Sequence, residues 1–541
     1  MSVKAVIMAG GQGTRLRSVA ADIPKPMVRI LDKPVLQYQI ENLRDNGITD
    51  IILITGYLGD CIRSYFGDGA ALGVKLSYFT EDHPMGTAGA LFYLKEQLTE
   101  DFLLLMGDLM LSVDFKRMLR AHREAGGSAT LFVHPNSHPY DSDVIVTETV
   151  GRLSDYTAEA DARRRARWAA CDVGRCAENH TAAYNAQAAN ISDENVSAGN
   201  VSVGNVSAVK HKDCTALAGA HQDEADGFAN RVCGVLGKKA ERTGYYHNQV
   251  NAGIYVISSA VPAGMEQPKE WSVIESELAE AAQRGADETE LKAIRKSGKI
   301  DLDKDVLRPL IEKGEVYAYH STEYVKDMGT PDRYASVTAD LKNGTVAARN
   351  LSRRQKCIFL DRDGTINAYR GFIREPEKLE LLDGAAEAIR KINASAYLVI
   401  VVTNQPVIAR GECSFAQLDE IHAKLETVLG EQGAYLDDIL YCPHHPDSGF
   451  EGEVAALKFK CGCRKPAPGM LLEAAARYNI DLSASWIIGD TTQDAASGEA
   501  CGVRSVLVKT GGKDAFDGKY EVHPAFVSEN LLDAVERILA E

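Results

Sequence analysis

Residues 357–365, Cys-Ile-Phe-Leu-Asp-Arg-Asp-Gly-Thr, decide how the second half of this 541-residue chain is interpreted. A short apolar run of strand type ends directly in two carboxylates, Asp361 and Asp363. Carboxylates one residue apart at a strand end can face one ligand, so that one attacks phosphorus while the other protonates the leaving oxygen. Taken alone, the same residues also fit a structural or calcium-binding turn.

Short apolar runs alternate with stretches of helical period on both sides of this segment. The runs cover residues 5–8, 51–55, 102–106, 129–133, 357–360, 397–403, 486–489 and 505–508, and a helical period covers residues 36–46. This alternation predicts mostly parallel sheets with crossover helices. Because single cores stop growing near roughly 250–300 residues, we predict two α/β, Rossmann-like domains. We place them at residues 1–345 and 356–541, joined by a polar linker at 346–355.

Residues 155–236 interrupt the first of these patterns. Ala, Asn, Ser, Asp and Gly dominate the segment, and Asn-Val-Ser recurs from Asn195, Asn200 and Asn205. Such a composition cannot bury much core, so we predict a low-complexity insertion and assign it no function.

Composition narrows the class of partner. The formal net charge is -16, which opposes general binding to nucleic acid and favours local basic groups that hold small phosphorylated ligands. The eleven cysteines are scattered, which suits a reducing compartment better than a disulfide framework. No apolar run is long enough for a signal peptide or a membrane span, so we expect a cytoplasmic protein with no membrane partner. The oligomeric state stays open.

The first apolar run leads into a glycine-rich loop. Its candidate nucleotide-binding residues are Gly10, Gly11, Gly13, Thr14 and Arg15. Glycines allow backbone N–H groups to approach a triphosphate, and an arginine adds a fork of donors. A tight strand-to-helix turn would explain the glycines equally well, but Lys25 in Pro24-Lys-Pro26 follows where it can return to the same phosphates.

This pair of motifs resembles the signature of the sugar-phosphate nucleotidyltransferases, and the resemblance covers most of residues 3–340 apart from the insertion. It implies catalytic roles for Arg15 and Lys25 and attack of a sugar phosphate on the α-phosphorus, with pyrophosphate leaving. It implies further roles for Gly86 and Thr87 (base), Asn251 (sugar), and Asp108 and Asp327 (Mg²⁺). For the sugar phosphate the candidates are Lys238 and Lys239, of which Lys238 is slightly favoured.

Three more motifs follow Asp361 and Asp363 in order. They are Thr403-Asn404-Gln405, Lys465 after Arg464, and Gly489-Asp490 with Asp494. The set resembles the haloacid-dehalogenase phosphatases from about residue 355 onward. The resemblance implies that Asp361 is the nucleophile and Asp363 the acid/base, and that Asp361, Asp363 and Asp490 hold Mg²⁺. It implies that Thr403 and Lys465 bind the phosphoryl oxygens and that Asp494 supports the loop. The residues that it implies for substrate contacts are Asn404, Gln405 and Arg464.

Cysteine and histidine gather in two short stretches of the second half. Cys442-Pro-His444-His445 is followed by Cys461-Gly-Cys463, which offers the donors of a closed tetrahedral Zn²⁺ site. We predict Cys442, His444, Cys461 and Cys463 as ligands, with His445 as the alternative fourth. Four protein ligands leave no place for a reacting water, so the predicted site is structural.

The zinc loop resembles that of the heptose-bisphosphate and histidinol-phosphate phosphatases. Fusion to a nucleotidyltransferase favours the former, because removal of a 7-phosphate from a 1,7-bisphosphate leaves a sugar 1-phosphate. The two resemblances together imply conversion of D-glycero-D-manno-heptose 1,7-bisphosphate and GTP to GDP-heptose. Guanine rests on the resemblance alone. One alternative is another sugar-1-phosphate nucleotidyltransferase (a mannose-1-phosphate guanylyltransferase, or a glucose-1-phosphate thymidylyl- or uridylyltransferase) fused to a histidinol-phosphate-phosphatase-like enzyme. An alternative of another class is an inactive regulatory scaffold.

Overall fold

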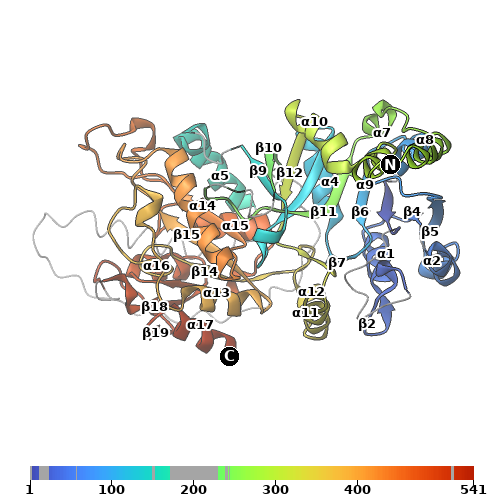
Figure 1. The fold of residues 1–541 in the computed structure, drawn as a ribbon. Coiled ribbons are helices and arrows are strands. Elements are labelled where there is room, and N and C mark those ends of the chain that lie inside the picture. Colours follow the sequence, from blue (N-terminus) through green and yellow to red (C-terminus); the bar gives the residue numbers. More distant parts are fainter. Residues whose placement is uncertain are drawn as a thin grey trace, which may run out of the picture.

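The computed structural model describes residues 3–10, 23–56, 58–148, 153–170, 229–237, 242, 244–512 and 517–541. Two α/β domains lie side by side within these residues, the first half of the chain on one side and the second half on the other (Figure 1). Several predicted site residues fall outside the described residues. They are Gly11, Gly13, Thr14, Arg15, Lys238 and Lys239.

The first domain is built on a nine-stranded mixed sheet with the order β5-β4-β1-β6-β11-β8-β12-β10-β9. Its strands are β1 (Lys4–Met8), β4 (Asp50–Thr55), β5 (Lys75–Thr80), β6 (Phe102–Met106), β8 (Ala129–His134), β9 (Val144–Thr147), β10 (Ala229–Leu236), β11 (Val250–Ile257) and β12 (Val316–His320). The neighbours β5, β4, β1 and β6 are parallel, whereas β11 runs antiparallel to β6 and β8. The predicted alternation of apolar runs and helices therefore corresponds to a doubly covered sheet.

The pleat of β6 shows why these runs are apolar throughout. Leu103 and Leu105 join one buried cluster with Leu36 of α1 (Val35–Asp45), while Leu104 joins the cluster of Leu91 on the opposite face. Successive side chains of a strand point to opposite faces, so a strand covered on both sides needs no polar alternation.

The helices of the first half of the chain lie on both faces of this sheet, beside the small sheets and, in one case, against the second half of the chain. They are α1 (Val35–Asp45), α2 (Gly59–Phe66), α3 (Gly89–Leu94), α4 (Phe115–Ala125), α5 (Ala158–Ala170), α7 (Ala260–Gly264), α8 (Trp271–Gln283), α9 (Glu288–Lys296), α10 (Arg308–Glu312), α11 (Pro331–Lys342) and α12 (Thr345–Ala348). Two small sheets pair β2 (Arg29–Ile30) with β3 (Lys33–Pro34), and β7 (Leu109–Ser112) with β13 (Tyr324–Asp327). No helix of the described ranges is long and apolar enough to cross a bilayer.

The second domain has a six-stranded parallel sheet in the order β16-β15-β14-β17-β18-β19. Its strands are β14 (Lys356–Leu360), β15 (Tyr397–Asn404), β16 (Asp438–Cys442), β17 (Trp486–Gly489), β18 (Arg504–Val508) and β19 (Phe526–Ser528). Its helices are α13 (Ala385–Asn393), α14 (Phe415–Glu431), α15 (Gly469–Tyr478), α16 (Thr492–Glu499) and α17 (Leu531–Ala540). The order reverses beside β14, and such switch points open a crevice at the carboxyl ends of the strands.

The predicted insertion, residues 155–236, includes regular elements at both ends. Residues 158–170 form α5, in which Trp168 is only 6% exposed, and residues 229–236 form β10, in which Val232 is buried. The low proportion of large apolar residues hid both elements, because each buries only a few side chains, against partners distant in sequence. Residues 171–228 lie outside the described part of the chain.

The segment predicted as a polar linker also contains buried contacts. Arg349 forms an ion pair with Asp437 at 3.0 Å, and both side chains are buried. The backbone N–H of the buried Leu351 donates to Glu323 Oε1 at 3.0 Å. The polar composition is therefore explained by buried charge pairs and hydrogen bonds between the domains.

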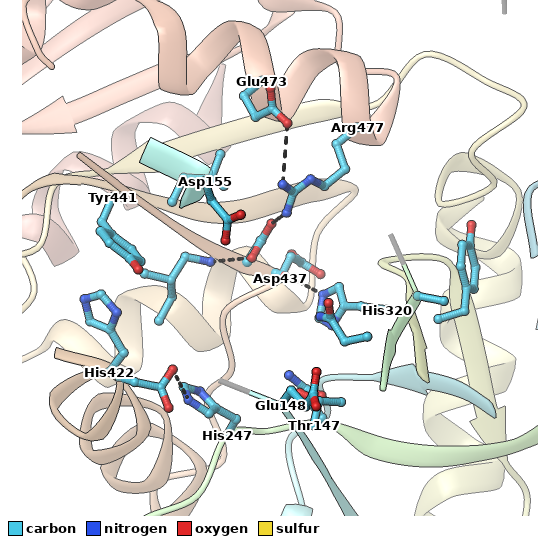
Figure 2. A pocket seen from close by; sticks show the side chains of 18 of the residues that line it. Thr147, Glu148, Asp155, His247, His320, His422, Asp437, Tyr441, Glu473 and Arg477 are labelled. Carbon is cyan, nitrogen blue, oxygen red and sulfur yellow. Dashed lines mark hydrogen bonds and ion pairs between the residues drawn. The ribbon is translucent and has the colours of Figure 1, made fainter. Parts of the chain in front are cut away.

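Helix α14 makes a second polar link between the domains (Figure 2). His247, in the loop before β11, lies between Glu426 and Asp419, with an Nε2–Oδ1 distance of 3.2 Å to Asp419. Burial works against the His247 imidazolium, but the two carboxylates raise its pKa to about 10. The hydroxyl of Thr427 accepts from the Tyr246 backbone N–H at 2.9 Å.

Replacement Arg349→Ala should lower the free energy of unfolding by roughly 3–5 kcal/mol, because it leaves the Asp437 carboxylate buried without its cation. Chemical denaturation monitored by circular dichroism would measure the change. Arg354→Ala, at an exposed position of the same segment, is the matched control and should change the value by less than about 0.5 kcal/mol. Equal small effects of the two replacements would show that the segment is a loose linker.

Candidate functional site

Three parallel strands of the second domain end at one point. Asp361 follows β14, Thr403 is the last residue but one of β15, and Asp490 follows β17. The backbone N–H of Asp361 donates to the Ile488 carbonyl at 2.9 Å, which extends the ladder to the predicted nucleophile. The sheet therefore brings together side chains separated by up to 129 positions, as predicted from the order of the motifs.

Lys465 lies at the centre of this site and is 2% exposed. Its Nζ is 2.7 Å from Asp361 Oδ1 and 2.5 Å from Asp494 Oδ1, and it donates to the Val402 carbonyl at 2.7 Å. Burial disfavours the ammonium, but the two carboxylates more than compensate and raise the pKa of Lys465. The lysine is therefore a fixed positive charge beside the predicted nucleophile.

Carboxylate oxygens of Asp361, Asp490 and Asp494 lie within 4.8 Å of one another and are buried. Burial, and the charges of Asp361 and Asp494, raise the pKa of Asp490 to about 8. Burial raises the pKa of Asp361 to about 6, against the opposing effect of Lys465. Three buried carboxylates with one ammonium leave an excess of negative charge, which fits a hard divalent cation such as Mg²⁺.

This set differs from the predicted Mg²⁺ ligands by one residue. Asp494 does support its loop, since Oδ2 accepts from the Thr491 hydroxyl at 2.7 Å, but its other oxygen joins the carboxylate cluster. The predicted ligand Asp363 instead directs its carboxylate to Arg362, with a 2.8 Å ion pair, and to Gln405. Sequence order could not reveal this, because a side chain's direction after a strand depends on the donors around it.

Asp363 is held by a small network of donors. The fully buried Arg362 donates through Nη2, Asn367 Nδ2 donates at 3.0 Å, and Gln405 Nε2 donates at 3.0 Å. Gln405 also donates to the Thr403 hydroxyl at 2.9 Å, which connects the predicted acid/base with a predicted phosphoryl ligand. The sequence assigned no role to Arg362, the residue between the two aspartates.

Two other side chains predicted to contact substrate, Asn404 and Arg464, form hydrogen bonds with the protein backbone instead. Asn404 forms a pair of hydrogen bonds with the backbone of Lys465, at 3.0 and 3.1 Å, and so fixes the loop that carries the lysine. Arg464 donates to the His444 carbonyl at 3.2 Å. Both side chains position neighbouring residues in this structure.

Close approach of backbone to Asp490 requires glycine at two positions. A Cβ at Gly364, whose φ is +84°, would lie 2.5 Å from Asp490 Oδ2, and one at Gly511 would lie 1.9 Å from the same atom. The glycine of the Asp-X-Asp-Gly-Thr motif is therefore explained by space for a carboxylate as well as by its φ value.

The four residues predicted for zinc come together as one buried group. The three sulfur atoms are 3.4–3.6 Å apart, and His444 Nδ1 is 3.2 Å from Cys463 Sγ and 3.4 Å from Cys442 Sγ. Sulfurs on a tetrahedral zinc lie roughly 3.8 Å apart, so the donors already converge on a common centre. The alternative ligand His445 points away, toward Asp447 and the ring of Phe450.

In the first domain, Lys25 and Asp108 form a close ion pair. Asp108 follows β6, and its carbonyl accepts from the Met328 backbone N–H at 3.1 Å, next to Asp327 at the end of β13. The two predicted carboxylates therefore lie at the same end of the β7–β13 pair, in which Asp327 is opposite Leu109. Gly10 follows β1 by two residues, and a Cβ there would lie 3.2 Å from the Gly56 nitrogen.

Asp327 is paired with a residue that the sequence did not indicate. Both of its carboxylate oxygens accept from Arg333 Nη1, at 2.9 and 2.8 Å, and Arg333 Nη2 contacts Asp141 at 2.8 Å. Burial opposes ionisation, but Arg333 dominates and lowers the pKa of Asp327. The carboxylate is thus ionised and is held by Arg333.

The predicted base loop closes on the segment after α9. Gly86 has φ +86°, and a Cβ there would lie 2.4 Å from the Ile300 carbonyl oxygen. The Thr87 hydroxyl accepts from the Leu302 backbone N–H at 2.7 Å. Nearby, burial raises the pKa of Glu81 to about 7, and its Oε2 would meet a Cβ at Gly10 at 3.3 Å.

A cavity of about 470 Å³ lies beside Asp327 and contains the predicted sugar-contacting Asn251. Its lining also includes His134 and Arg333 of the first domain and Arg390 of the second. Asn251 Nδ2 donates to the Tyr255 hydroxyl at 3.0 Å, which fixes the amide at the cavity wall. A larger cavity of about 1690 Å³ lies between the domains and is lined by residues of both (Figure 2). Neither Asp108 nor Asp361 lines it.

Family models match two separate parts of the chain. The nucleotidyl transferase model matches residues 4–157, and a HAD-hydrolase-like model matches residues 462–534. The chain is thus a bifunctional enzyme, in which a nucleotidyltransferase is joined to a HAD-type phosphatase. The D-glycero-beta-D-manno-heptose-1,7-bisphosphate 7-phosphatase of Pasteurella multocida (strain Pm70) is 40% identical over 180 residues, 33% of this chain and 94% of that protein. Through this part, the chain belongs to that phosphatase family.

Two solved structures are similar to separate parts of the chain. The D,D-heptose 1,7-bisphosphate phosphatase from B. bronchiseptica, complexed with magnesium and phosphate, is 33% identical with a TM-score of 0.31, covering 34% of this chain and 99% of that one. HddC from Yersinia pseudotuberculosis, complexed with GMP-PN, is 18% identical with a TM-score of 0.38, covering 63% of this chain and 99% of that one.

The raised carboxylate pKa values predict how Mg²⁺ stabilisation depends on pH. Unfolded aspartates titrate near pH 3.9, so the metal-free fold retains protons up to about pH 6 at Asp361 and about pH 8 at Asp490 and loses stability as pH rises through this window. Mg²⁺ binds the deprotonated carboxylates. Its increase in Tm should therefore be larger near pH 8.5 than near pH 6.

Thermal unfolding with and without MgCl₂ at both pH values would measure this difference. Asp490→Asn is the control variant and should remove the part of the shift that belongs to the phosphatase site. An Mg²⁺ shift that is equal at both pH values, or larger at the lower one, would contradict the prediction.

Proposed function

We propose that the chain removes the 7-phosphate of D-glycero-D-manno-heptose 1,7-bisphosphate and then transfers GMP from GTP to the resulting heptose 1-phosphate, giving GDP-heptose and pyrophosphate. The observation that carries this proposal is the assembled phosphatase centre of Asp361, Lys465 and Asp490, in a domain that belongs to the heptose-bisphosphate phosphatase family. The nucleotidyl transferase half supplies a consumer for the sugar 1-phosphate that this reaction leaves.

In the phosphatase reaction, an Asp361 oxygen attacks the phosphorus of the 7-phosphate while Asp363 protonates the leaving O7. Lys465 and the Thr403 hydroxyl hold phosphoryl oxygens, and Lys465 also keeps Asp361 ionised. Asp363 then accepts a proton from water that attacks the aspartyl phosphate, which releases inorganic phosphate. Mg²⁺, held by Asp361, Asp490 and Asp494, would neutralise phosphate charge in both steps.

In the transfer reaction, the sugar 1-phosphate attacks the α-phosphorus in line and pyrophosphate leaves, so that positioning and charge neutralisation supply most of the catalysis. Lys25 would contact the phosphates of GTP, while Asp108 and Asp327 would hold Mg²⁺. The cavity of about 470 Å³ beside Asn251 and Asp327 would hold the sugar. Gly86 and Thr87 would contact the base.

Zn²⁺ would be held by Cys442, His444, Cys461 and Cys463, whose donor atoms converge. The donor set of three sulfurs and one imidazole fits zinc, and it leaves no open coordination position. The metal would fix the loop that leads to Lys465 and would take no part in the chemistry.

The direct test is incubation of the purified chain with heptose 1,7-bisphosphate, Mg²⁺ and each nucleoside triphosphate in turn, with products followed by mass spectrometry. We expect inorganic phosphate in every case, and pyrophosphate with GDP-heptose only when GTP is present. Phosphate without any nucleotide sugar would refute the transferase assignment. Absence of phosphate would refute the phosphatase substrate.

The two active sites should be separable by single replacements. Asp361→Asn should lower phosphatase kcat by roughly 10³-fold or more while heptose 1-phosphate is still converted, because the nucleophile is lost. Asp108→Asn should do the reverse, because only the transferase would lose a metal ligand. Steady-state assays of each half-reaction would measure both, and loss of both activities in either variant would argue against independent sites.

A further inference from the structure

The Cys/His cluster of the phosphatase domain touches the other half of the chain. His444 Nδ1 faces the sulfur atoms, and His444 Nε2 lies 2.7 Å from the carbonyl oxygen of Tyr156. A histidine that binds metal through one ring nitrogen commonly donates its other N–H to a carbonyl, which fixes the tautomer and the ring orientation. Here that carbonyl comes from the segment just before α5, in the first half of the sequence.

One face of helix α5 also contacts the loop that carries Cys461 and Cys463. Asp161 accepts from the backbone N–H of Gly462, the residue between two of the cysteines, at 3.1 and 3.3 Å. Asp161 is itself buried and paired with Arg165 at 2.7 Å. Because positions 161, 165 and 168 are spaced by four and three residues, their side chains share one helix face.

Trp168 completes that face. It belongs to the same buried cluster as Cys442, Cys461 and Cys463, and its Nε1 donates to Glu473 Oε2 at 2.9 Å. A Cβ at Gly469 would lie 2.6 Å from the Trp168 ring, so α5 packs directly against the loop after the cysteines.

Tyr156 itself is inserted among aromatic rings of the second domain. Its ring stacks on Phe415 at 5.4 Å with an interplanar angle of 20°, and it meets the His444 ring edge to face at 5.9 Å. This places an aromatic anchor of the first half beside the metal-binding histidine, where its position depends on the position of His444.

We propose that the Cys/His centre joins the two domains: Tyr156 and α5 form its outer shell, so that Zn²⁺ binding and the docking of α5 stabilise each other. The coupling is reciprocal, since anything that favours the docked state must favour metal retention by the same free energy. The inference rests on the proposed zinc site and is independent of either substrate.

Zinc release from the intact chain tests one direction of the coupling. Trp168→Ala and Asp161→Ala should each weaken Zn²⁺ binding by roughly 10–100-fold, the range found when outer-shell partners of metal ligands are removed. A chromogenic chelator would report the release. The matched controls are Trp271→Ala, on α8, and Glu159→Ala, at an exposed position of α5, and both should release zinc as the parent does.

Hydrogen exchange of the unmutated chain tests the other direction and does not depend on a variant that folds. Removal of Zn²⁺ should increase amide exchange in residues 158–168, with α1 in the first domain unchanged, and readdition should reverse the increase. Unchanged exchange in α5 together with unchanged zinc release from Trp168→Ala would overturn the proposal. Failure of the parent to bind Zn²⁺ would overturn it as well, while leaving the proposed catalytic reactions intact.

Discussion

The buried ammonium of Lys465 is the constraint on which the phosphatase centre depends. It is taken out of water, so it needs anions on more than one side, and it finds them in Asp361 and Asp494 and in the Val402 carbonyl. These partners come from the end of β14, from β15 and from the first turn of α16, which must therefore keep their relative positions. Asn404 fixes the backbone of the lysine, and the carboxylates retain more negative charge than one lysine can neutralise. The same arrangement thus fixes the groups around the lysine and prepares the site for a divalent cation.

The two enzymes are joined by buried polar contacts as well as by the chain. Arg349 pairs with Asp437, His247 lies between two carboxylates of α14, and α5 contacts the cysteine loop. Charged pairs of this kind contribute little net stability but are costly to break singly, so they favour one relative placement of the domains. The loop that carries His247 leads directly into β11, the strand that carries Asn251. The phosphatase helix α14 therefore supports the strand proposed to contact the sugar.

The contacts of α5 give a physical meaning to part of a segment whose composition suggested none. Ala and Arg dominate residues 158–168, yet Asp161 and Trp168 are buried because their partners are a backbone N–H, a glutamate and the loop around two cysteines. A segment of this kind gains its order from the partner surface rather than from its own apolar content. The cysteine loop is the surface that orders it, and a metal there would have consequences beyond its own domain.

The sequence by itself determined the two α/β units and the strands β1, β4, β6 and β8 of the first sheet and β14, β15, β17 and β18 of the second, because apolar periodicity and closely spaced motifs are local properties. Asp361, Lys465 and Asp490, and the four Cys/His donors, come together as predicted. Only the tertiary structure decided the direction of Asp363, the inclusion of Asp494 with the carboxylates, the pairing of Asp327 with Arg333, and the burial of α5 and residues 349–351. Each of these depends on a donor or a surface far away in sequence, and no local pattern of residues records where such a partner will lie in space.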